Sequence, residues 1–131
     1  MKGSYVLVIR LLQDEKIKVG ALGDIEFKKG YYAYVGSAMN GIEKRVARHG
    51  RRGKKLRWHI DYLTEKAFIE EIWYKEGAKE ECKFADYFRH AGLEFIPNFG
   101  SGDCKCKSHL FYDTGKDRIH GILIKAGMKR M

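Results

Sequence analysis

Residues 34–49 read YVGSAMNGIEKRVARH, and this stretch joins the end of a strand to the start of a helix. The tyrosine-rich run Tyr31–Val35 before it predicts a β-strand. Asn40 lies three residues before Glu43, a pair that is typical of a helix N-terminus with Asn40 as the N-cap. We expect that helix to end near Gly50, because glycine commonly terminates helices. The stretch therefore predicts a strand–turn–helix unit.

Strand and helix patterns alternate on both sides of this unit. Strands are predicted at Tyr5–Leu11, Ile17–Val19, Ile25–Phe27, Phe68–Tyr74, Leu93–Ile96, His109–Tyr112 and Arg118–Lys125, and helices at Arg57–Leu63 and Ala78–Ala91. The second and third strands are expected to form a hairpin, because Gly20 and Gly23 lie between them. This order predicts an α/β fold in one domain that spans residues 1–131.

The chain is strongly basic, with a net charge of +9. Its cations concentrate between Glu43 and Asp61, where no acidic residue interrupts them. Those expected to contact phosphates are Arg48, Arg51, Arg52, Lys54, Lys55 and Arg57. Gly50 and Gly53 suggest a pliable loop that follows a phosphate backbone. Nucleic acid is favoured as the partner over a membrane surface or a merely solvated basic face.

The apolar runs argue against a membrane protein. Tyr5–Ile9 and Ile119–Ile124 are too short to cross a bilayer. Met1 and Lys2 lead directly into the first predicted strand, without the pattern of a secretory leader. We therefore expect a cytoplasmic protein with no membrane partner.

The three cysteines are an odd number, which argues against a disulfide framework. Cys82, Cys104, Cys106 and His109 together offer four zinc-type ligands. However, the Cys104–Cys106 spacing is tighter than that of common zinc sites, and Cys82 lies on a different element. Inert thiols are therefore the favoured interpretation, and a structural Zn²⁺ is the alternative.

The opening stretch also suggests phosphate chemistry. Arg45 and His49 are four residues apart, so they project from one face of the predicted helix. Gly36 lacks a side chain and would let a substrate backbone approach. A guanidinium near a helix N-terminus and tyrosine hydroxyls suits the charge of a phosphoryl transition state. From the spacing alone, an ordinary capped surface helix with a solvated Arg45 and His49 is slightly favoured over a phosphate-binding site.

The run from Tyr34 to His49 resembles the second half of the GIY-YIG nuclease signature. From Tyr5 to about Ile124 the chain is similar to the Uri-type branch of stand-alone GIY-YIG domains, including the runs RWHIDYL and PNFGSGDCKCKSHLFY. The resemblance implies a small, mainly antiparallel central sheet flanked by helices, in which the predicted hairpin is an insertion. It also implies a metal-dependent endonuclease that hydrolyses phosphodiester bonds of duplex or branched DNA, in DNA repair or processing.

The resemblance further implies roles for individual residues. The catalytic set is Tyr5, Tyr34, Arg45 and His49, with His59 as a secondary residue. Glu81, rather than the neighbouring Glu80, is expected to hold Mg²⁺ or Mn²⁺. A free tyrosine has a pKa near 10. Tyr5 can therefore act as a general base only if neighbouring cations lower its pKa or another residue assists it.

Two alternatives from other functional classes stay open. The chain fits a catalytically inactive nucleic-acid-binding module with the same fold. It also fits a structural or partner-binding domain whose charge is incidental. Metal-dependent cleavage of DNA would separate the nuclease from both.

Overall fold

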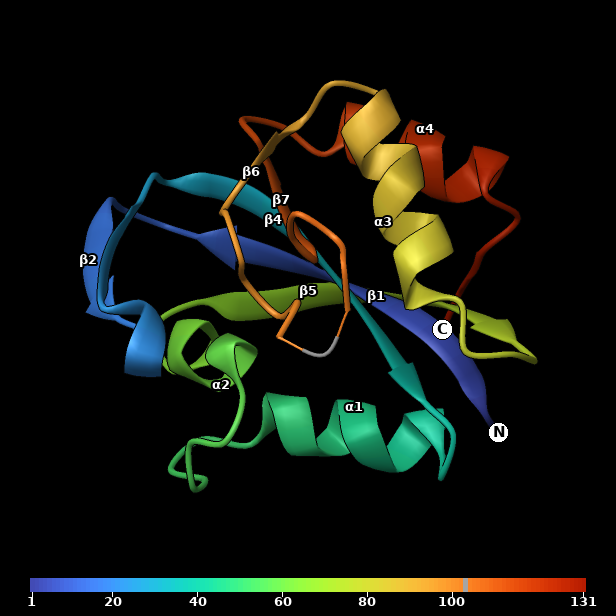
Figure 1. Ribbon diagram of the computed structural model, residues 1–131, viewed down its shortest axis with the longest axis horizontal. Helices are drawn as coiled ribbons and strands as arrows, with labels where there is room; N and C mark the ends of the chain where they lie inside the picture. Colours follow the sequence, from blue (N-terminus) through green and yellow to red (C-terminus); the bar gives the residue numbers. More distant parts are fainter. Residues whose placement is uncertain (103) are drawn as a thin grey trace.

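The computed structural model describes residues 1–102 and 104–131, which form two sheets and four α-helices (Figure 1). The elements in chain order are β1 (Gly3–Leu11), β2 (Glu15–Lys18), a 3₁₀ turn (Gly20–Leu22), β3 (Asp24–Phe27), β4 (Gly30–Ala38), α1 (Ile42–Gly50), α2 (His59–Thr64), β5 (Phe68–Glu76), α3 (Glu81–His90), β6 (Glu94–Phe95), β7 (Leu110–Asp113), α4 (Asp117–Lys125) and β8 (Lys129–Arg130). Within the described residues, no helix combines the length and the apolarity that crossing a bilayer requires.

The central sheet has the strand order β6-β7-β4-β1-β5-β8, and every pair of neighbours is antiparallel. β2 and β3 form a separate antiparallel hairpin between β1 and β4 in the chain. The mixed α/β fold predicted from the sequence, with a mainly antiparallel sheet and an inserted hairpin, is therefore confirmed.

Alternation along β1 divides the apolar core between the two faces of the sheet. Tyr5, Leu7 and Ile9 lie in the core that also contains residues of α1, α2 and the hairpin. Val6 and Val8 point to the opposite face, into a core that contains residues of α3 and α4. Figure 1 shows α1 and α2 on one side of the sheet and α3 and α4 on the other.

The segment predicted as a strand at Arg118–Lys125 is a helix, α4, so that prediction was wrong. Ile119 and Leu123 are fully buried and Ile122 packs against the same core, which is the spacing of one helix face. A run of isoleucine and leucine suggested a strand, whereas the i, i+3, i+4 spacing of the buried positions specifies a helix.

Several element boundaries also differ from the predictions, and two of them belong to helices that carry candidate site residues, α1 and α3. Gly41, with φ of 127°, occupies the N-cap of α1 in place of Asn40, and no side chain caps that end. A positive φ of this size favours glycine. Helix α3 begins at Glu81, three residues after the predicted start at Ala78. Glu81 therefore belongs to the first turn of a helix.

Candidate active site

β4 extends beyond β7, the strand that pairs with it on the side away from β1. β7 pairs with β4 from Tyr31 to Tyr34, and one further bond joins the Val35 N–H to the His109 carbonyl at 2.9 Å. β4 itself runs on to Ala38 beside β1. Side chains that belong to both faces of the sheet can meet at this edge. A concave pocket of about 680 Å³ lies there, lined by the end of β4 together with residues of α1, α3 and the loop before β7.

The Tyr5 ring lies directly over Gly36. The two residues are register partners in β1 and β4, and a Cβ atom on Gly36 would lie 2.6 Å from the Tyr5 hydroxyl oxygen. Gly36 is therefore required by the Tyr5 ring. The space freed by the missing side chain is therefore occupied by the Tyr5 ring, while Gly36 itself still lines the pocket.

His49 lies behind Tyr5 and is almost completely buried. Its Nε2 atom is 2.8 Å from the Tyr5 hydroxyl, whereas its Nδ1 atom has no hydrogen-bond partner among the described residues. Burial lowers the pKa of His49 to about 4, although the charge of Asp61 acts in the opposite direction. The imidazole is therefore neutral at pH 7.

Both tyrosines keep their protons at neutral pH. Burial raises the pKa of Tyr5 to about 12, and the charge and hydrogen bond of Arg45 only partly oppose this shift. Burial also raises the pKa of Tyr34. Of the two conditions for Tyr5 as a general base, a pKa lowered by nearby cations is therefore not met, because desolvation of the hydroxyl outweighs the arginine, and assistance from another residue is the condition that stays open.

Arg45 reaches the pocket from α1 and is held there by contacts on two sides. Its Nη1 atom donates to the Ser37 carbonyl at 3.2 Å, and its guanidinium carbon lies 4.6 Å from the centre of the Trp58 ring. A cation over an indole face gains electrostatic attraction without losing its charge. Trp58 was not among the predicted site residues, although an aromatic residue inside a basic run was a visible signal.

Glu81 enters the pocket from the first turn of α3. Its Oε2 atom accepts a hydrogen bond from the Ser37 hydroxyl, and its Oε1 atom lies 3.6 Å from the Lys79 ammonium. Glu80 instead pairs with Lys83 at 3.2 Å. Of the two adjacent carboxylates, Glu81 is the one that is bound to the end of β4. Ser37 was not predicted as a site residue.

The structure thus brings most of the predicted set together. Tyr5, Tyr34, Arg45 and Glu81 line the pocket, and His49 contacts the first of them. His59 lies outside the pocket lining, and its Nδ1 atom accepts the Gly100 N–H at 2.8 Å. This bond supports the loop that follows β6.

Arg48, predicted to contact phosphate, has a partner inside the protein. Both of its terminal nitrogens donate to the buried Asp61 carboxylate at 2.9 Å, and its guanidinium lies 4.3 Å from the Trp58 ring. Burial alone would raise the pKa of Asp61, but the hydrogen bonds from Arg48 and from the N–H groups of Trp58 and Arg57 outweigh it and lower the pKa to about 2. The pair anchors α2 to α1.

Two further cations of the basic segment also have internal partners. The Lys54 ammonium donates to the Arg51 carbonyl at 2.7 Å and to the Thr64 hydroxyl at 3.2 Å, and its side chain is only 6% exposed. Arg52 donates to the carbonyls of Glu65 and Ala67. These bonds fix the loop between α1 and α2.

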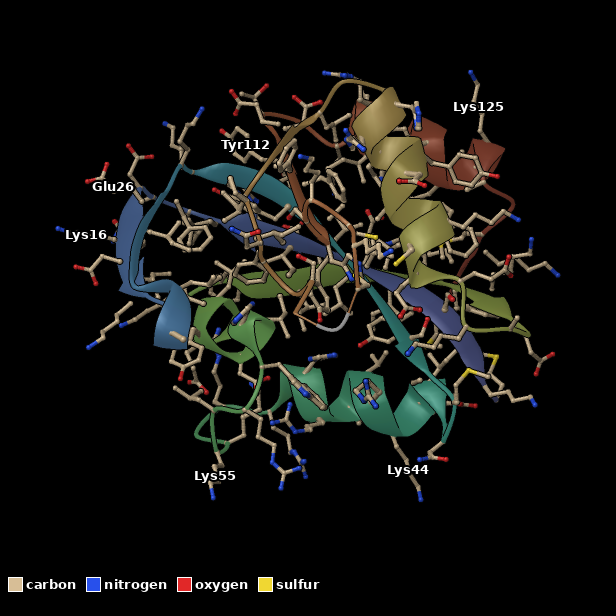
Figure 2. The ribbon with its side chains drawn as sticks, viewed as in Figure 1. Lys16, Glu26, Lys44, Lys55, Tyr112 and Lys125 are labelled. Carbon is tan, nitrogen blue, oxygen red and sulfur yellow. The ribbon has the colours of Figure 1, made fainter. Side chains whose placement is uncertain are left out.

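In the loop between α1 and α2, the exposed cations whose side chains have no hydrogen-bond or ion-pair partner among the described residues are Arg51, Lys55 and Arg57. They line a second concave surface of about 570 Å³ together with the three cations described above. Figure 2 shows Lys55 extending outward from this loop. The expected phosphate-binding surface is therefore smaller than the charge of the segment suggested.

The four zinc-type ligands also lie together. Cys82, Cys104, Cys106 and His109 each offer a ligand atom, and these atoms are all within 4.8 Å of one another. Cys82 comes from α3 and the other three come from the loop that leads into β7. The cluster adjoins the pocket, because Cys82, Cys104 and His109 contribute to its lining.

The structure is that of a small α/β protein with a polar pocket at the point where β4 extends beyond its pairing with β7. The chain belongs to the family described as Domain of unknown function DUF123, whose model matches residues 4–130. No curated protein and no solved structure matches the chain. The match contains every residue of the pocket, and the description of the family states no activity.

Proposed function

We propose that this protein is a divalent-metal-dependent DNA endonuclease of the GIY-YIG type, within the Uri-type branch. The observation that carries the proposal is the meeting of two tyrosines, one arginine and one glutamate in a single pocket, from four separate elements. These are the residues that the resemblance to GIY-YIG nucleases implies. If Arg45 were only a solvated residue of an ordinary surface helix, two tyrosines and a glutamate from other elements would not be needed beside it.

The pocket fits a hydrated Mg²⁺ or Mn²⁺ ion. Glu81 is largely shielded from solvent, with 15% of its side chain exposed, and it offers hard oxygen atoms. Mg²⁺ keeps several water molecules and needs as little as one carboxylate in addition to substrate phosphate. Glu81 would hold the ion, assisted by the Ser37 hydroxyl oxygen. When bound, such an ion polarises a phosphate and makes a bound water more acidic.

Arg45 would bind the non-bridging oxygens of the scissile phosphate. Trp58 and the Ser37 carbonyl hold the guanidinium in place, so little orientation is lost when a phosphate binds. Two N–H groups of a guanidinium match two phosphate oxygens, and this match strengthens as charge develops on them.

The pair of Tyr5 and His49 provides a route for the proton of the attacking water. Because the pKa of Tyr5 is about 12, its hydroxyl accepts a proton readily only as it gives its own proton to His49. The distance of 2.8 Å to Nε2 permits that transfer, in the tautomer with Nε2 unprotonated. The water oxygen would then attack phosphorus while the bond to the 3′ oxygen breaks, and the departing 3′ oxygen would take up a proton from solvent. Tyr34 would help to orient the water.

DNA would be held mainly through its backbone. The loop that follows α1 exposes Arg51, Lys55 and Arg57. These cations suit contacts with DNA phosphates, and such contacts do not distinguish one sequence from another. Duplex or branched DNA is the expected substrate, and repair or processing of DNA is the corresponding cellular role. We expect weak sequence selectivity.

The test is cleavage of plasmid and branched DNA with and without Mg²⁺ or Mn²⁺. Arg45→Ala and Glu81→Gln should each reduce the cleavage rate by on the order of 10²–10³-fold. Lys44→Ala and Asp86→Asn are matched controls, because each is an exposed residue on the same helix as the residue it controls for. Rates near that of the wild type in both site variants, with their folding verified by thermal unfolding, would contradict the assignment.

A catalytically inactive nucleic-acid-binding module is the second candidate. The raised pKa values of Tyr5 and Tyr34 favour it, since neither tyrosine is prepared to act as a base by itself. This candidate predicts salt-dependent DNA binding with no cleavage under any divalent ion. The same cleavage assay, run beside a binding titration, distinguishes the two.

A further inference from the structure

The cluster of three cysteines and one histidine beside the pocket has a geometry that the proposed nuclease chemistry does not use. The Nε2 atom of His109 lies 3.8 Å from the Cys82 sulfur and 3.3 Å from the Cys104 sulfur. With Zn–S near 2.3 Å and Zn–N near 2.0 Å, neighbouring ligands of a tetrahedral zinc ion lie about 3.5–3.8 Å apart. The observed distances bracket this range.

We propose that Cys82, Cys104, Cys106 and His109 form a closed structural Zn²⁺ site. Three thiolates and one imidazole complete a tetrahedral shell, which leaves no open position for substrate or water. The site is therefore structural and is separate from the ion that Glu81 would hold. This proposal does not rest on the nuclease assignment.

The surroundings of the ligands favour zinc over inert thiols. Inert cysteines are usually buried among apolar side chains, whereas all three cysteines here are partly exposed and their sulfur atoms approach one another and an imidazole. Each of the three is a free thiol in the structure.

A metal at this point would join the first turn of α3 to the loop that leads into β7. Cys82 follows Glu81 in α3, and the remaining ligands belong to the loop that packs Gly100 against the Tyr34 ring. The ion would therefore fix the first turn of α3 relative to the end of β4. Such a clamp would hold Cys104, Cys106 and His109 next to the pocket.

The first measurement is the absorption spectrum of the whole protein loaded with Co²⁺ under reducing conditions. Tetrahedral Co²⁺ with three sulfur ligands gives intense d–d bands in the visible range and a sulfur-to-cobalt charge-transfer band in the near ultraviolet. We expect saturation at one Co²⁺ per chain and loss of both bands when Zn²⁺ is added. Weak bands typical of oxygen ligation, or no binding, would overturn the proposal.

Substitutions then assign the ligands. Cys106→Ser and His109→Gln should each lose the charge-transfer spectrum of the wild type or weaken Zn²⁺ binding by on the order of 10-fold to 100-fold or more. His90→Gln is the matched control, because His90 is an exposed histidine on α3. If a ligand variant fails to fold, the wild-type spectrum still decides the question.

The last measurement separates this site from the proposed nuclease site. Zn²⁺ should raise the unfolding temperature of the metal-stripped protein, and Mg²⁺ should not replace it. Glu81→Gln should retain zinc binding even if it abolishes cleavage. Zinc binding without any nuclease activity would support the structural site and remove only the proposed function. An unfolding temperature that does not respond to Zn²⁺ would remove the structural site.

Discussion

The buried His49 should make stability depend on pH between about 4 and 6.5. In the unfolded chain this imidazole titrates near 6.5, whereas burial lowers the pKa of His49 to about 4 in the folded protein. Between these two values the unfolded state binds more protons than the folded state. The free energy of unfolding therefore rises with pH across this window, and its contribution is lost as the pH falls through it.

The magnitude follows from the two pKa values. Each unit of difference between the folded and unfolded pKa values corresponds to about 1.4 kcal/mol, so the full difference changes the free energy of unfolding by about 3 kcal/mol. Burial also lowers the pKa values of His59 and His109, which adds to the slope in the same direction. A comparison with a variant that lacks only the His49 imidazole is therefore needed to isolate its part.

The assay is urea unfolding of the wild type and of His49→Gln at several pH values from 4 to 7.5. Glutamine does not titrate and retains a side-chain amide that can reach the Tyr5 hydroxyl. The difference in unfolding free energy between the two proteins should change by about 3 kcal/mol over this range, in favour of the wild type at higher pH. If the unfolding free energies of the two proteins changed with pH in parallel, the reasoning would be refuted, because His49 would then not be held neutral by burial.

Three further outcomes follow from the geometry. Gly36→Ala should displace the Tyr5 ring, since the added Cβ would lie 2.6 Å from its hydroxyl oxygen, and cleavage should fall on the order of 10-fold or more while the protein stays folded by circular dichroism. Asp61→Ala should lower the free energy of unfolding by about 3–5 kcal/mol in urea titrations, because it leaves a guanidinium without its buried partner. The double variant Arg51→Ala/Lys55→Ala should reduce the slope of log affinity against log salt by roughly 1.8 on duplex DNA, measured without metal. An unchanged slope would mean that the basic loop is only a solvated face.

The parts of the fold that could be predicted were those with strong local patterns. β1 and β4 contain the uninterrupted apolar and aromatic runs Tyr5–Ile9 and Tyr31–Val35, and such short runs are typical of strands. Helix α4 was missed because isoleucine and leucine suit both strand and helix in a short window. Its identity depends on burial of Ile119 and Leu123 against α3 and the sheet, which a local pattern does not reveal.

The candidate site was predictable to the extent that its residues resemble a signature. Tyr34, Arg45 and His49 lie within sixteen consecutive residues, so one motif locates them. Trp58 and Ser37 were missed because their roles depend on contacts between elements. The same limit applied to the cations of the loop. Their number could be counted from the sequence, but the internal partners of Lys54 and Arg52 became visible only once α2 was placed beside α1.

The protonation states in the pocket have a common cause and a common consequence. Burial raises the pKa of Tyr5 to about 12 and lowers that of His49 to about 4, so neither member of the hydrogen-bonded pair is charged at neutral pH. Arg45 and Glu81 are then the charges that dominate the lining close to the tyrosines. An uncharged Tyr5–His49 pair cannot compete with phosphate for the guanidinium or with a divalent ion for the carboxylate. Burial of the pair therefore leaves both charges available to ligands. In the proposed reaction, the pair would take a proton only from a water that has become acidic beside Tyr5.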